Sequence, residues 1–138
     1  MIQRLQSLWL LIASVFAFLT YKFPFYSGNV TKKDVTQFAK LTASYHFGTL
    51  ILTGILAAGC LILIFLFKDR KLQLRLTVLA FIVAVLNIII YFSQMSKFIN
   101  GNLSFAAILS LAIPVFLFFA ARGIWKDEKL VKSLDRLR

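Results

Sequence analysis

The sequence predicts an all-α membrane protein, an antiparallel bundle of four transmembrane helices with both termini in the cytoplasm. Three observations lead to this fold class. Hydrophobic residues make up 60% of the 138 residues and charged residues 15%, whereas soluble domains carry about 45–50% and roughly 25%. The apolar residues fall into four runs that contain no charged side chain. Lysine and arginine flank these runs unequally on their two sides.

The four apolar runs have the length of membrane-spanning helices. They cover residues 5–21, 47–67, 76–96 and 103–121. At about 1.5 Å per residue, roughly 20 helical residues cross a hydrocarbon core about 30 Å thick. Four such helices in a soluble protein would leave too few polar residues to cover its surface. We therefore expect a single domain over residues 1–138, in which every run spans the bilayer.

The first run follows the N-terminus directly, and we expect it to be retained as a helix. No small-x-small cleavage site follows it, so it does not have the pattern of a cleaved signal peptide. Pro24 and Gly28 end the helix. Thr31 and Asp34 have the spacing of a capping box, and apolar residues continue at helical spacing. This predicts a short amphipathic helix in a periplasmic loop over residues 22–46, whose role the sequence does not define.

The second and third runs contain the candidates for helix contact, which are Gly54, Ala58 and Asn87. Gly54 and Ala58 form a small-xxx-small pair that lets another helix approach closely, although glycine is also simply frequent in membrane helices. Asn87 lies near the middle of its run, where a carboxamide is costly unless it is hydrogen-bonded. We expect Asn87 to bond to another helix or to a partner, in preference to a substrate. The short loop 68–75 makes the two helices antiparallel neighbours.

The fourth run contains Pro114, which should kink its helix, and the turn residues Asn100, Gly101 and Asn102 precede it. Beyond it, residues 124–138 form an amphipathic tail. Its apolar face indicates contact with the membrane interface or with a partner's groove. The candidates for a partner or lipid surface are the basic residues of the second loop and the tail, a boundary tryptophan and the apolar face: Lys68, Arg70, Lys71, Arg75, Arg122, Trp125, Lys126, Leu130, Val131, Leu134 and Leu137.

The flanking charges predict the orientation. Eleven of the sixteen lysines and arginines lie beside the N-terminus, in the second loop or in the tail, and five lie in the other two loops. Loops that stay in the cytoplasm carry the excess of positive charge. The eleven basic residues are therefore expected in the cytoplasm. The net charge of +11 is explained by contact with anionic head groups, so nucleic acid is not expected as a partner.

The sequence excludes several classes of activity. No Asp, Glu, Lys or Arg lies inside an apolar run, whereas proton-coupled transporters need an ionisable residue at depth. The single His46 rules out a bis-histidine haem, and the single Cys60 rules out a dithiol site. His46 at a helix end suits a polar boundary residue, and Cys60 suits a small packing residue. We expect no catalytic residue, no cofactor site and no metal site, and hence no enzyme.

The chain also resembles a known family at its N-terminus. Met1-Ile2-Gln3-Arg4-Leu5-Gln6, running directly into an apolar helix, is similar to the opening of an uncharacterised family of small four-helix inner-membrane proteins from Bacteroidota. The pair Phe23-Pro24, the basic second loop and the basic tail are similar too. The family is catalogued as a domain of unknown function. The resemblance therefore implies a multi-pass protein of the bacterial inner membrane and no activity.

These observations favour a non-enzymatic membrane subunit or accessory protein of a larger inner-membrane complex. It would act through helix packing and a basic cytoplasmic face, with lipids and other membrane proteins as partners. The alternative is a small oligomeric transporter or channel, which would need a polar path lined by Asn87, Thr49, Thr53 and Ser110. The sequence leaves a homo-oligomer open.

Overall fold

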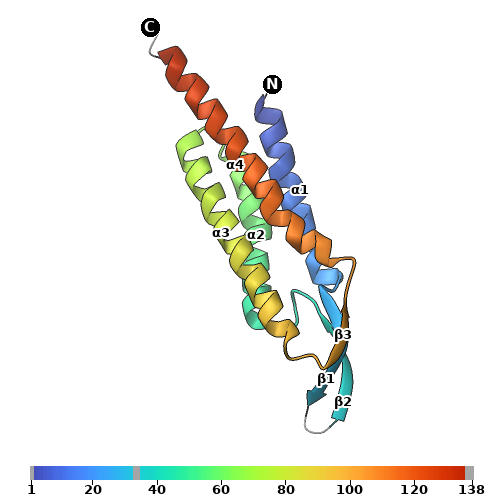
Figure 1. The fold of residues 1–138 in the computed structure, drawn as a ribbon. Helices are drawn as coiled ribbons and strands as arrows, with labels where there is room; N and C mark the ends of the chain where they lie inside the picture. Colours follow the sequence, from blue (N-terminus) through green and yellow to red (C-terminus); the bar gives the residue numbers. More distant parts are fainter. Residues whose placement is uncertain (1, 33–34, 136–138) are drawn as a thin grey trace.

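Four long helices dominate the computed structural model, which describes residues 2–32 and 35–135, the side chains of 2–4, 32, 134 and 135 excepted. They are α1 (Ile2–Lys22), α2 (Phe47–Phe65), α3 (Arg70–Met95) and α4 (Ala107–Asp135). Each is long and apolar enough to cross a membrane. The helices form an antiparallel bundle in which α1 and α3 each pack against α2 and α4 (Figure 1). The start of α1 and the end of α4 lie at one end of the bundle.

Three helices are longer than the apolar runs predicted, and α1 exceeds its run only by a few residues, since it covers Ile2–Lys22 and not 5–21. The third begins at Arg70 instead of residue 76, because the loop residues before the run contain neither glycine nor proline and continue the helix. The fourth begins at Ala107 instead of residue 103 and extends to Asp135, so the tail is a continuation of α4 and not a separate element. The helix continues through Pro114. Residues 136–138, including the predicted Leu137, lie outside the described residues.

A small antiparallel sheet at the opposite end of the bundle corrects the all-α prediction (Figure 1). It consists of β1 (Tyr26–Lys32), β2 (Val35–Leu41) and β3 (Asn100–Leu103), in the order β2-β1-β3. The amphipathic helix expected after Thr31 is therefore wrong, and the expected turn at residues 100–102 is a strand.

The residues of the hairpin explain why it forms strands and not a helix. Val30, Thr31, Val35 and Thr36 are β-branched and Phe38 is aromatic, and such side chains pack well on a pleated surface and lose rotamer freedom in a helix. The residues that suggested a capping box lie instead where β1 ends and β2 begins. The two strands pair from Lys32 and Val35 onward.

Two groups of buried apolar residues hold the molecule together. The first lies inside the bundle and contains many alanines, which let the helices approach closely, along with Cys60, which is fully buried. The second group joins the sheet to the ends of α3 and α4, and consists of Phe25, Leu41, Tyr91, Phe98 and Ala107. The ring of Phe25 stacks on that of Tyr91, with 4.7 Å between centroids. The sheet is thus fixed to the bundle by packing.

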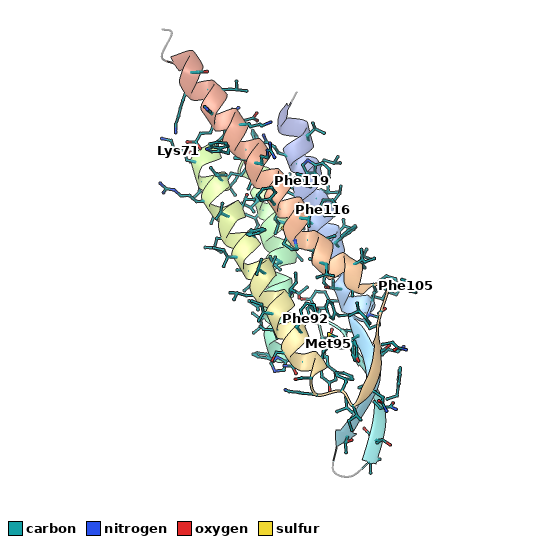
Figure 2. All side chains as sticks on the ribbon, viewed as in Figure 1. Lys71, Phe92, Met95, Phe105, Phe116 and Phe119 are labelled. Carbon is teal, nitrogen blue, oxygen red and sulfur yellow. The ribbon has the colours of Figure 1, made fainter. Side chains whose placement is uncertain are left out.

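The outward faces of the helices are as apolar as the interior. Ile55, Ile62, Ile89 and Phe118 are each more than half exposed, and Figure 2 shows side chains projecting from all sides of the bundle. A contiguous apolar surface of this extent is unfavourable in water. It suits helices surrounded by lipid.

Candidate functional site

Within the described residues, no three His, Cys, Asp or Glu side chains lie close enough together to hold a metal ion. His46 is the N-cap of α2, and its Nδ1 accepts a hydrogen bond from the backbone N–H of Gly48 at 3.1 Å. Because that bond satisfies a backbone donor of the first helical turn, His46 has a structural role.

Asn87 lies in the bundle interior and bonds to a neighbouring helix. Its Nδ2 donates to Oγ1 of Thr53 at 2.9 Å, joining α3 to α2. The interhelical bond expected of Asn87 is therefore present. Among the described residues, three buried polar atoms have no hydrogen-bond partner: Oδ1 of Asn87, Oη of Tyr91 and Oγ of Ser110.

Gly54 and Ala58 have different surroundings. A Cβ on Gly54 would lie 3.1 Å from the hydroxyl of Tyr21, which donates to the carbonyl of Leu50 on α2. Ala58 instead faces outward and is exposed. Its place in the contact with α1 is taken by Ala57, whose carbonyl accepts a bond from Ser14 at 2.9 Å. The contact between α1 and α2 therefore includes Gly54 and Ala57.

A polar contact between α1 and α4, which the sequence did not predict, joins regions close to the two ends of the chain. Nε2 of Gln6 on α1 donates to Oδ2 of Asp127 on α4 at 2.6 Å, and each residue is only 6% exposed. A Cβ on Gly123 would lie 2.8 Å from Cγ of Gln6, so glycine makes room for this side chain. Arg70 donates to the backbone carbonyl of Asp127 at 3.5 Å. Gly123 and Asp127 lie on one face of α4, which faces Gln6.

The last part of α4, residues 129–135, extends past the starts of α1 and α3 (Figure 1). We call it the projecting end. Leu130 and Val131 are exposed there by 53% and 40%. Two lysines of this segment contact the preceding turn: Lys132 forms an ion pair with Glu128 at 2.8 Å, and Nζ of Lys129 lies 5.9 Å from the ring centre of Trp125. The side chain of Leu134, the third residue of the predicted apolar face, lies outside the described residues.

The predicted basic residues gather at the same end of the molecule. Figure 2 places Lys71 at the start of α3, at the end of the bundle where both termini lie. Lys71 and Arg75 are within electrostatic range of Glu128 on α4. Trp125 on α4 is 57% exposed. The other expected residues of the partner or lipid surface belong to the same ends of α3 and α4, to the loop before α3 or to the projecting end: Lys68, Arg70, Arg122, Lys126, Leu130 and Val131.

Comparison with known protein families gives a match over almost the whole chain. A family model described as "Domain of unknown function (DUF4293)" matches residues 2–137. The match therefore includes the sheet as well as the four helices. No curated protein and no solved structure matches the chain.

Proposed function

The chain belongs to the DUF4293 family of domains of unknown function, and on this premise we propose that it is a non-enzymatic subunit of a larger membrane complex. Its place would be the inner membrane of a bacterium, with both termini and the basic end of the bundle in the cytoplasm. The observation that carries the proposal is the projecting end of α4, a continuation of a membrane helix that presents apolar side chains beyond the bundle.

The length of α4 supports contact with a protein more than contact with lipid alone. Its 29 residues extend roughly 44 Å, whereas the hydrocarbon core is about 30 Å thick. A helix that continues out of the membrane cannot also lie flat in the interface. Leu130 and Val131 then remain exposed to water unless a partner covers them, and an amphipathic helix with such an apolar face fits a hydrophobic groove.

We expect the double substitution Leu130→Gln and Val131→Gln to abolish association with the partner. The change removes the apolar contact and leaves the helix and its charges in place. The measurement is quantitative mass spectrometry of proteins that co-purify with the tagged chain in mild detergent. The matched control is Lys132→Gln, which removes a charge from the same segment and should retain the partner. Equal recovery of every co-purifying protein from the double variant and the wild type would contradict the proposal.

The structure also guides the choice of truncation. Removing residues 126–138 would delete Asp127 and with it the contact to Gln6. A truncation after Glu128 removes the projecting end and leaves that contact intact. It should insert normally and lose the partner.

Orientation is tested by reporter fusions. Alkaline phosphatase and a fluorescent protein fused after Asn29, Arg75 or Arg138 should report a periplasmic position for the first site and a cytoplasmic position for the other two. The physical reason is the excess of lysine and arginine around the last two sites. Periplasmic activity of the fusion at Arg138 would overturn the proposed orientation.

A small oligomeric transporter or channel is the second candidate. The observation in its favour is that buried polar atoms of Asn87 and Ser110 have no hydrogen-bond partner among the described residues, and such atoms could face a polar path. It has less support because other buried hydroxyls bond to backbone carbonyls, as Ser14 does to Ala57 and Thr49 does to Ala43. Solute flux in proteoliposomes that Asn87→Leu abolishes would favour this candidate over a subunit.

A further inference from the structure

A groove runs along the outer surface between α3 and α4, near the basic end of the bundle. Its volume is about 630 Å³, within the range of roughly 300–1,000 Å³ of small-molecule sites. Three residues of α3 and four of α4 line it: Leu74, Val78, Phe81, Phe118, Ala121, Arg122 and Trp125. Arg122 provides the only charged side chain of this lining.

The groove changes character along its length. Leu74 and Trp125 lie at the basic end. Phe81 lies seven residues after Leu74 on α3, and Phe118 lies seven residues before Trp125 on α4, so both are further from that end. Seven helical residues correspond to about 10 Å. The groove therefore begins at the level where Trp125 suits a membrane interface and extends into the level of the hydrocarbon. An occupant must be polar at one end and apolar over the remainder.

The positive charge at the polar end of the groove favours an anionic occupant. Arg122 lies in the groove, and Arg75 follows the lining residue Leu74. Among the described residues, Arg122 forms no ion pair, whereas Arg75 lies within electrostatic range of Glu128. Asp127 is buried against Gln6, and Glu128 is paired with Lys132. The guanidinium group of Arg122 can therefore bind a phosphate group.

We propose that this groove binds one anionic phospholipid from the leaflet that surrounds the basic end of the bundle. An acyl chain lies on Val78, Phe81 and Phe118, and the phosphate of the head group meets Arg122. Basic sites between membrane helices on the cytoplasmic side are suited to such head groups. This site is separate from the projecting end of α4 and does not depend on the proposed partner.

The test measures phospholipid binding by native mass spectrometry. The full chain, delipidated in detergent, is titrated with phosphatidylglycerol or with phosphatidylcholine of the same acyl chains. The wild type should retain one phosphatidylglycerol in preference to phosphatidylcholine. Arg122→Gln should reduce this preference about fivefold, the effect of one basic residue near an anionic lipid, and Arg122→Lys should restore most of it. Ala121→Trp fills the groove and should reduce binding of both lipids.

Two controls separate the groove from its surroundings. Ala58→Trp places the same bulky side chain on the exposed face of α2, and Lys97→Gln removes a charge at the other end of the bundle; both should bind like the wild type. Equal binding of the two lipids by the wild type would overturn the proposal. So would unchanged selectivity in Arg122→Gln. A wild-type dimer that Ala121→Trp converts to a lipid-free monomer would also overturn it, since the groove would then be an interface between two copies.

Discussion

Replacing Gly101 by valine should separate β3 from β1 and expose the sheet end of the molecule. Gly101 lies opposite Gly28 in the sheet. A Cβ on Gly101 would lie 2.6 Å from the carbonyl oxygen of Ser27 and 2.9 Å from Cα of Gly28. Carbon atoms in good contact are about 3.5–4.0 Å apart. Both neighbours are backbone atoms, so no side-chain rotation can relieve the overlap.

The new side chain would also displace the residue that secures the strand. The same Cβ would lie 2.5 Å from Cε1 of Tyr26, whose hydroxyl donates to the carbonyl of Gly101 at 2.7 Å. Overpacking typically costs about 1–3 kcal/mol, and the cost reaches the upper end where the backbone must shift. Because β3 pairs with β1 over only four residues, we expect the strand to detach while the helices stay folded.

Hydrogen exchange measures this loss locally. About 3 kcal/mol corresponds to a roughly hundredfold fall in the protection of amides in residues 100–103. The matched control is Asn102→Val, which adds valine at an exposed position of the same strand and should leave protection unchanged. Wild-type protection in the Gly101→Val chain would show that the two strands can move apart without losing their pairing.

The sheet illustrates what could not be predicted from this sequence. The four helices follow from hydropathy because each is decided by local composition, and Asn87 was identified because it is polar in an apolar run. The sheet depends on β3, which pairs with Tyr26 across more than 70 positions of the chain. Local spacing around Thr31 instead resembled a helix start. Pro24 and Gly28 were correctly interpreted as the end of the first helix, but not as the beginning of a strand.

The same reason explains the contacts at the other end. Gln6 and Asp127 are 121 positions apart, so their pairing required knowledge of which helices are neighbours. The charge pattern predicted where the chain leaves the apolar region near Arg122, and an amphipathic tail was predicted beyond it, but not that α4 continues into this tail without a break. Charged residues such as Lys126 and Lys129 are good helix formers. Their polarity and their helix propensity therefore give different answers about where the helix ends.

Gln6 and Asp127 should be energetically coupled, and loss of their contact should lower the free energy of unfolding of the bundle. Gln6→Met keeps the shape of the side chain and removes the donor to the carboxylate of Asp127. A hydrogen bond to a charged group contributes roughly 1.5–3 kcal/mol, and a buried charge left without a partner costs more. We therefore expect a loss of about 2–4 kcal/mol in the free energy of unfolding, measured by denaturant titration in detergent micelles.

A double-mutant cycle distinguishes this contact from ordinary packing. Asp127→Leu alone leaves the amide of Gln6 without its acceptor, whereas Gln6→Met together with Asp127→Leu replaces both partners by apolar groups. Such double replacements are often close to neutral, so the double variant should recover most of the stability. Additive losses would contradict the coupling. Because Asp127 lies directly before the projecting end of α4, Gln6→Met should also increase hydrogen exchange in residues 129–133, while the amides of Asn100–Leu103 remain protected.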